Sequence, residues 1–216
     1  MQSKYIYLVR HGESEGNAGQ YRQGPTSPLT QKGREQARII AERCKSLPID
    51  ACISSTMTRA KETSEIISKE INKSFEYSDL FIERLRPTKQ FGMTKDDPKS
   101  IEIDRLLIEN FSKPNFRIAD EENFEDLNTR GQKALDMLVQ HKSKHILLVT
   151  HGLFMRILAG RVIFGDDFNG VIGDDMMRAL KTANTGLVVF KYDEETKEWI
   201  LITWNDHAHL ADSEVK

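Results

Sequence analysis

The sequence predicts an α/β protein, a three-layer α/β/α sandwich in which helices cover both faces of a mostly parallel sheet. Short apolar runs rich in β-branched and aromatic residues alternate with segments in which apolar residues recur at helical spacing. Two of these apolar runs, far apart in the chain, both end in the dipeptide His-Gly. Strands that alternate with helices favour right-handed crossovers and a parallel sheet.

The first part of the chain has the order strand, helix, strand, helix, strand. The first strand covers the apolar run from Tyr5 to Val9, and the first helix begins after Thr30, which can cap it, and continues to about Ser46. The next expected elements are a strand from Asp50 to Ser54, a helix from about Arg59 to Ile71 and a strand from Phe75 to Tyr77.

The alternation stops between about Leu80 and Phe124. This segment has three prolines, one helical pattern from about Lys99 to Phe111 and an acidic cluster at 120–122. We interpret residues 80–124 as a cap inserted over the strand ends. The chain 1–216 is therefore expected to form a single domain with this insertion.

The regular alternation then resumes. The expected elements are a helix from Phe124 to His141, a strand from His145 to Thr150, a helix from Gly152 to Phe164, a short helix from Asp174 to Leu180, and a β-hairpin of Gly186 to Tyr192 with Trp199 to Trp204.

Composition excludes several classes of function. The chain has 31 Lys and Arg against 33 Asp and Glu, a net charge of −2, so no global positive field would attract nucleic acid. The first apolar run is too short to span a bilayer and has no features of a secretory signal, so we expect a cytoplasmic protein with no membrane partner. Cys44 and Cys52 lack metal-ligand spacing and are expected to be buried free thiols.

Candidate functional residues follow the two strands that end in His-Gly. Arg10 and His11 come directly after the first strand, and His151 follows the strand from 145 to 150. Ligands of open α/β sheets bind outside the carboxyl ends of the parallel strands. A lone histidine is more often a hydrogen-bonded structural residue, but two neighbouring strands would bring both rings and the arginine into one crevice.

The stretch LVRHGES at 8–14 resembles the signature of the histidine phosphatase superfamily, also called the phosphoglycerate mutase-like family. Four motifs occur in the expected order and cover most of the chain. The further matches are Pro28-Leu29-Thr30 with Gly33, Gln36 and Ala37; Ser54-Ser55 with Arg59, Ala60 and Thr63; Val149-Thr150-His151-Gly152; and Asn184-Thr185-Gly186.

The resemblance implies phosphoryl transfer with His11 as the nucleophile. A neutral imidazole nitrogen is a good nucleophile near neutral pH. Arg10 and Arg59 can present planar donor forks to the phosphate oxygens, and His151 would be a further donor. An arginine that opens a helix, as Arg59 does, is unfavourable to the helix dipole unless an anion binds there.

Glu83 is the candidate general acid and base. It follows the third strand, where related enzymes place a glutamate that protonates the leaving oxygen and then activates water. A surface glutamate paired with Arg84 or Arg86 is the alternative interpretation, and Glu121 and Glu122 from the cap are the other candidate proton donors.

Asn17 and the pair His207 and His209 are weaker candidates for the site. Asn17 resembles the family's phosphate-binding asparagine, although simple loop structure explains it equally well. His207 and His209 are separated by two positions, which does not make a metal site, and the family's chemistry requires no metal or other cofactor.

The resemblance favours a phosphatase over a mutase. Phosphoglycerate mutases continue their glutamate with Arg-His-Tyr-Gly, whereas here Glu83 is followed by Arg84-Leu85-Arg86-Pro87. The partner is expected to be a small-molecule phosphate ester. A mutase and a non-catalytic phospholigand-binding protein are the alternatives, and the sequence leaves both the substrate and the oligomeric state open. The cations available for a second anionic group are Arg84, Arg86, Lys89, Lys95 and Arg117.

Overall fold

A computed structural model describes residues 3–22 and 24–210, and its centre is one six-stranded sheet. The strands are β1 (Ser3–Arg10), β2 (Ala51–Ser54), β3 (Glu76–Tyr77), β4 (His145–Thr150), β5 (Leu187–Asp193) and β6 (Glu198–Asp206). Their order in the sheet is β3-β2-β4-β1-β5-β6. β1, β4, β2 and β3 pair in parallel, while β5 pairs antiparallel with both of its neighbours.

The side chains of β1 alternate between the two faces of the sheet, as a strand's period of two requires. Ile6 and Leu8 belong to one buried cluster, and Tyr7 and Val9 belong to another. The sheet is therefore buried on both faces, which explains why its central strands are continuous apolar runs.

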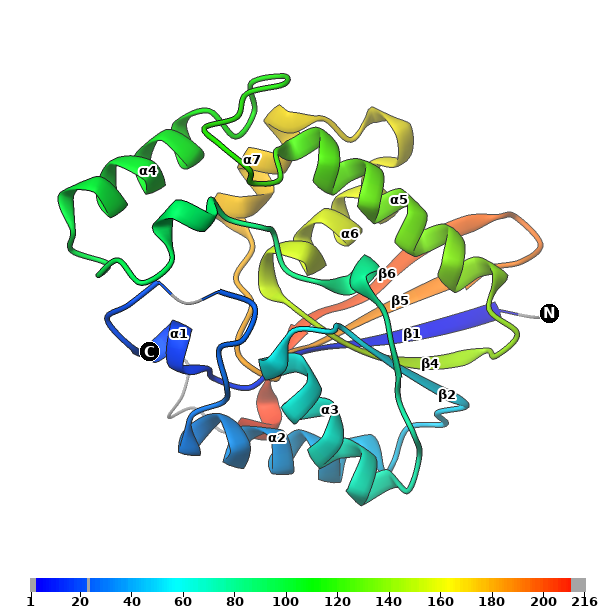
Figure 1. Cartoon of the computed structure of the whole chain (residues 1–216). Helices are drawn as coiled ribbons and strands as arrows, with labels where there is room; N and C mark the ends of the chain where they lie inside the picture. The colour runs from blue at the N-terminus through cyan, green and yellow to red at the C-terminus, as the bar shows by residue number, and fades with distance from the viewer. Residues whose placement is uncertain (1–2, 23, 211–216) are drawn as a thin grey trace.

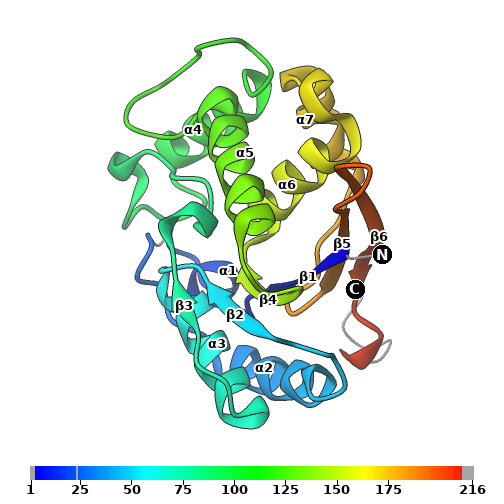
Figure 2. The same cartoon turned by 90° about the vertical axis from the view of Figure 1, so that its right-hand side faces the viewer.

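Helices cover both faces, as Figures 1 and 2 show. α2 (Gln31–Cys44) and α3 (Thr58–Ile71) pack on one face, and α5 (Phe124–Gln140) and α6 (Gly152–Phe164) pack on the other. α7 (Gly170–Ala179) packs against α6. The predicted α/β sandwich with a mostly parallel sheet is confirmed.

Local signals account for most helix ends. The Thr30 side chain accepts a hydrogen bond from the Gly33 amide and caps α2, as predicted. α7 begins at Gly170 rather than at Asp174, because Asn169 caps it through the amides of Val171 and Ile172. The short helix α1 (Glu15–Ala18) was not expected; Ser14 and Asn17 form a capping box there.

The segment 80–124 lies beyond the carboxyl ends of the parallel strands (Figure 1). It contains α4 (Pro98–Glu109) and a short 3-10 turn at Thr88–Gln90, and another 3-10 turn, Asp79–Phe81, leads into it. Backbone hydrogen bonds join it to the loop after α1, between the Arg22 amide and the Met93 carbonyl and between the Lys95 amide and the Gln20 carbonyl. These contacts hold the residues that precede α4 against the loop after α1.

Two other expectations concern burial and length. Cys44 and Cys52 are buried free cysteines, as predicted. Within the described ranges, none of the helices combines the length and the apolar character needed to cross a bilayer.

Candidate functional site at the strand ends

The pairing of β1 with β4 brings the two histidines together. Arg10 lies opposite Thr150 in the parallel register, so His11 and His151 follow side by side at the end of the sheet. The His11 amide donates to the Thr150 carbonyl, and the two ring centroids lie 5.0 Å apart. The condition on which the sequence interpretation depended, that these two strands are neighbours, is met.

Hydrogen bonds define the tautomer of His11. Its Nδ1 lies 2.6 Å from the Gly12 carbonyl oxygen, which can only accept, so Nδ1 carries the proton. Nε2 accepts a hydrogen bond from Arg59 Nε at 3.2 Å. The lone pair of Nε2 therefore points toward the arginine that the sequence analysis assigned to phosphate.

Burial keeps both rings neutral. The pKa of His11 is well below its usual value because the ring is desolvated and because Arg59 and Arg10 are close. Desolvation, Arg59 and His11 itself lower the pKa of His151 in the same way. The nucleophilic form of an imidazole is its neutral form, so this environment preserves it.

His151 has one nitrogen without a partner. Its Nε2 lies 2.8 Å from Ser55 Oγ, and that oxygen already accepts from the Met57 amide. If Ser55 donates its hydroxyl proton to Nε2, all three groups are satisfied and the ring proton lies on Nδ1. His151 Nδ1 is buried and has no hydrogen-bond partner among the described residues.

The two arginines are largely desolvated. Arg10 donates from Nη1 to the Thr182 carbonyl at 2.5 Å, and its buried Nε has no partner among the described residues. Burial lowers the pKa of Arg10 to about 10 and also lowers the pKa of Arg59, while Glu83 opposes both shifts. At neutral pH both guanidinium groups keep their charge, in a place with little water to solvate it.

Glu83 lies against the start of α6. Its carboxylate accepts from the backbone amides of Leu153 and Phe154, both at 3.2 Å, and from the Arg84 amide at 3.0 Å. The first-turn amides of a helix have no partners within the helix, so they orient this side chain.

The two other candidate proton donors are held elsewhere. Glu121 is buried and accepts from the amides of Ile118 and Ala119. Glu122 forms an ion pair with Arg130 at 2.7 Å. Neither lines the cavity at the strand ends, whereas Glu83 does.

A cavity of about 230 Å³ opens in front of His11. Its polar wall includes Arg59 and Glu83, and Asn17 lines it from α1. Arg10 and His151 are not among the residues that line it. The other residues that line the cavity are Ser14, Gly16, Arg22, Ser27, Arg86, Gln90 and Phe91.

Asn17 has a structural role besides its position in the wall. Its Oδ1 accepts from the Ser14 amide at 3.3 Å and from Ser14 Oγ at 3.1 Å. The two interpretations of this residue, binding and loop structure, are therefore compatible with each other.

Of the five cations proposed for a second anionic group, only Arg86 lines this cavity. Arg84 stacks on Phe111, and Lys95 donates to the Asn17 carbonyl. Arg22 is the cation that the sequence analysis missed. No local sequence pattern marks Arg22 as part of the site, because its ion pair with Asp104 of α4 forms only when the chain folds.

His209 belongs to the packing behind the site. Its Nε2 lies 3.1 Å from Thr185 Oγ1, and the Thr185 amide donates to the Arg10 carbonyl. His207 Nδ1 donates to the Asn205 carbonyl at 2.6 Å. Both rings therefore make hydrogen bonds that hold the end of the chain against the residues behind the site.

Fold and site together define an α/β protein that gathers two histidines and two arginines at the ends of parallel strands. Residues 6–207 match the family described as the histidine phosphatase superfamily (branch 1), and the chain belongs to this superfamily. The resemblance seen in the sequence motifs is thus confirmed.

Proteins similar to this chain in sequence or in fold carry the names of a probable mutase and of a phosphatase. The chain is 30% identical to "Probable phosphoglycerate mutase GpmB" of Enterobacter sp. (strain 638), over 95% of this chain and 94% of the relative. Its fold matches Bacillus stearothermophilus YhfR with a TM-score of 0.81 and 25% identity, covering 96% and 99% of the two chains. It also matches a phosphoserine phosphatase from Entamoeba histolytica, solved with 3-phosphoglyceric acid, with a TM-score of 0.75, 22% identity and coverage of 96% and 99%.

Proposed function

We propose that this protein is a phosphatase that hydrolyses a small phosphomonoester through a phosphohistidine on His11, with Glu83 as the general acid and base. The observation that carries the proposal is the state of His11. Its Nδ1 proton is held by the Gly12 carbonyl, and its neutral Nε2 lies beside Arg59 on the wall of a cavity.

In the first step His11 Nε2 attacks phosphorus, and the bond from phosphorus to the ester oxygen breaks. Glu83 gives its proton to that oxygen, so the alcohol leaves neutral. Before this attack, Arg59 Nε must turn from His11 Nε2 to a phosphate oxygen, which frees the lone pair of Nε2. Arg10 Nε and His151 Nδ1, which have no partner among the described residues, are further donors for the equatorial oxygens.

In the second step water attacks the phosphohistidine. Glu83 takes a proton from the water, the bond between nitrogen and phosphorus breaks, and phosphate leaves with His11 neutral again. The arginines stabilise negative charge in both transition states. Since buried donors without acceptors are costly, a bound anion would stabilise the site as well as react there.

The experiment is hydrolysis of p-nitrophenyl phosphate by the wild-type protein and by His11→Ala, with acid-labile phosphoenzyme trapped in the same samples. We expect phosphate release and a trapped phosphoenzyme in the wild type, and a loss of at least about 10³-fold in kcat for the variant.

The matched control is His145→Ala, which changes a histidine on β4 that stacks on Tyr5 far from the cavity. This variant should keep its phosphoenzyme. Hydrolysis that survives in His11→Ala would refute the proposal. A wild-type protein that neither hydrolyses nor becomes phosphorylated, with any ester offered, would favour the phospholigand-binding alternative.

The mutase alternative rests on the name of the 30% identical relatives. It predicts that the phosphoryl group passes to a second hydroxyl rather than to water. Quantifying free phosphate against transferred phosphate, with 3-phosphoglycerate as donor and acceptor, separates the two. We expect free phosphate as the main product.

A further inference from the structure

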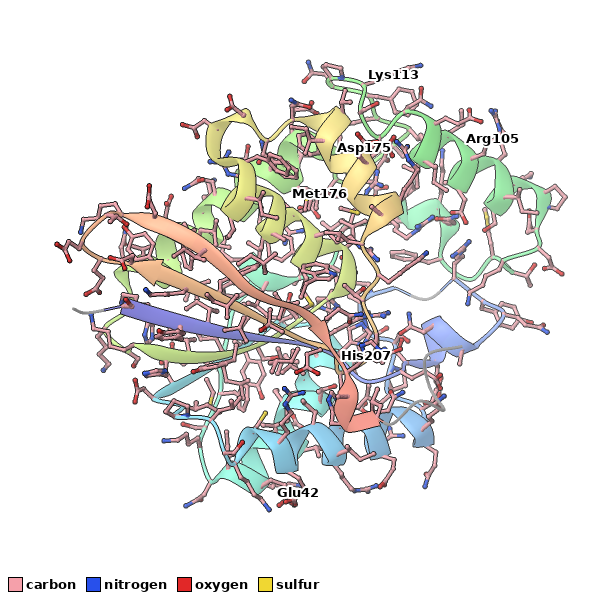
Figure 3. The ribbon with its side chains drawn as sticks, turned by 180° about the vertical axis from the view of Figure 1, so that it is seen from behind. Glu42, Arg105, Lys113, Asp175, Met176 and His207 are labelled. Atoms are coloured by element: carbon pink, nitrogen blue, oxygen red, sulfur yellow. The ribbon has the colours of Figure 1, made fainter. Side chains whose placement is uncertain are left out.

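Residues 180–184 lead from α7 back to the sheet and form neither helix nor strand. Figure 3 shows this stretch running from the end of α7, the helix that carries Asp175 and Met176, down to the start of β5. Outside helices and strands, backbone carbonyl groups need hydrogen-bond donors from elsewhere. We call residues 180–184 the α7–β5 segment.

Three successive carbonyl groups of the α7–β5 segment accept hydrogen bonds from three side chains. Arg156 Nε of α6 donates to the Leu180 carbonyl at 2.7 Å, and Trp204 Nε1 of β6 donates to the next carbonyl along the chain at 3.0 Å. The Thr182 carbonyl accepts from Arg10 Nη1 at 2.5 Å. Two other elements therefore hold the segment at the point where it meets the arginine that we propose binds phosphate.

Arg156 makes a second contact with the same segment. Its Nη2 lies 3.4 Å from Thr182 Oγ1, so Thr182 accepts from Arg156 at its hydroxyl and from Arg10 at its carbonyl. The packing is tight here, because a Cβ on Gly152 would lie 2.6 Å from Thr182 Oγ1 and 3.2 Å from Arg10 Nε. Arg10 has little room to keep its place if Thr182 moves.

Hydrogen bonds, and not charge pairing, hold Arg156 in place. Its side chain donates only to the α7–β5 segment, and it forms no ion pair among the residues that the structure describes. Desolvation lowers the pKa of Arg10 most, and the charge of Arg156 lowers it further. Because the two cations repel each other, Arg156 can hold Arg10 only through the segment.

The contact with Thr182 leaves another nitrogen of Arg10 free. Nη1 is taken by the Thr182 carbonyl, while the buried Nε has no acceptor among the described residues. A guanidinium group is planar and rigid, so a fixed Nη1 also fixes the direction of Nε. Donors in a catalytic site must be held within about 0.5 Å of the productive geometry, which a side chain supported at one end by a mobile loop would not satisfy.

We propose that Arg156 is a positioning residue, which fixes the α7–β5 segment at Leu180 and Thr182 so that the segment directs Arg10 toward the phosphoryl group. This inference rests on the proposed function, because it takes Arg10 as a phosphate donor. Arg156 does not line the cavity in front of His11, and its contribution passes through Arg10.

A double-mutant cycle of Arg156→Gln and Arg10→Ala tests this route. The readouts are kcat/KM for p-nitrophenyl phosphate and the Kd of inorganic phosphate from calorimetric titration. We expect Arg156→Gln alone to lower kcat/KM and phosphate affinity about 10- to 30-fold, the size of effect of a hydrogen bond from a charged group. In the Arg10→Ala background, the same substitution should change either quantity less than about twofold. Arg59 and His151 remain as donors there, so phosphate binding stays measurable.

The matched control is Arg178→Gln, which changes an exposed arginine in the last turn of α7 that pairs with Asp174 and Asp175. It removes an arginine close in the chain to the α7–β5 segment but none of the hydrogen bonds of that segment. Both readouts should stay within about twofold of the wild type.

Arg156→Lys separates the planar fork from the charge. An ammonium group keeps the charge but does not present paired donors to Leu180 and Thr182, so we expect a loss between those of the wild type and Arg156→Gln. If Arg156→Gln does not fold, the cycle is run with Arg156→Lys, whose loss should likewise vanish in the Arg10→Ala background.

The outcomes separate the positioning role from the proposed function. A loss that persists undiminished in the Arg10→Ala background would overturn the positioning role, since Arg156 would then act without Arg10. Wild-type kcat/KM and phosphate affinity in Arg156→Gln, or full recovery in Arg156→Lys, would also overturn it and leave the phosphatase standing. A non-additive cycle in phosphate binding, in a protein that neither hydrolyses esters nor forms a phosphoenzyme, would overturn the phosphatase and support the positioning role.

Discussion

The tautomer and the neutral charge state of His11 are set by a few neighbouring groups. A carbonyl oxygen one residue away holds the Nδ1 proton, and burial among cations keeps the ring unprotonated. Glu83 is held in the same way, by backbone amides at the start of α6. Because backbone groups orient both side chains, their directions do not depend on flexible neighbours.

At the scale of the residue we predict that Glu83→Gln slows hydrolysis most for poor leaving groups. Glutamine keeps an acceptor oxygen for the α6 amides but has no proton to give to an alkoxide. We expect a loss of about 10²- to 10⁴-fold in kcat/KM for alkyl phosphates and a much smaller loss for p-nitrophenyl phosphate.

Glu122→Gln is the matched control, because it weakens the ion pair with Arg130 without touching the cavity. It should lower stability and leave the dependence on the leaving group unchanged. Equal losses on both classes of ester in Glu83→Gln would show that this residue is not the acid.

The loop after β1 and the first turn of α2 approach each other so closely that their backbones are in contact. A Cβ on Gly12, in the loop after β1, would lie 2.3 Å from the Gly33 carbonyl oxygen, and a Cβ on Gly33 in α2 would lie 1.9 Å from the Glu13 carbonyl oxygen. Neither backbone can give way as a side chain could. This close approach lets the first turn of α2 support the loop that begins at His11.

At the scale of the element we predict that Gly33→Ala is destabilising, by about 2–3 kcal/mol in urea unfolding, because overpacking against backbone forces both elements apart. It should also lower kcat, since the loop after His11 must move. Gly131→Ala in α5 is the control, because its Cβ would meet side chains rather than backbone, a methyl group of Ile157 at 3.0 Å and Arg161 Cγ at 3.7 Å. Equal stability of the two variants would contradict the argument.

Three histidines of the described residues have lowered pKa values in the folded state; His11 and His151 are buried and His209 is half-buried. His11 and His151 lie at the site, and desolvation lowers the pKa of His209 to about 4. In the unfolded chain each would titrate near 6.5. Below that pH the unfolded state binds protons that the folded state does not, so stability decreases as pH falls.

We therefore predict that the free energy of unfolding falls between pH 7 and pH 4.5, a window above the lowered pKa of Asp206 at about 2. His209→Gln should remove the part of this slope that comes from its own lowered pKa. The measurement is urea unfolding at half-unit pH steps. A free energy that stays constant across the window would contradict the prediction.

Sequence periodicity was sufficient for most of the elements. The apolar run of β1, the cap at Thr30 and the apolar faces of the helices are local properties, and they predicted the layers correctly. Local patterns did not predict the order of the strands in the sheet, in which β4, from the second half of the chain, lies between β1 and β2. The antiparallel pairing of β5 with β1 likewise depends on how the hairpin meets the sheet.

The sequence by itself determined the fold class and placed Arg10, His11 and His151 at the ends of two strands, because apolar runs and helical periodicity are local patterns. The tertiary structure decided that these two strands are neighbours and that the two histidines meet. Only the tertiary structure decided that Glu83, and neither Glu121 nor Glu122, lines the cavity, and that Arg22 joins Arg86 there. These residues come from separate loops, and α4 brings two of them together through Asp104. Such contacts depend on the packing of the whole chain, which no local pattern encodes.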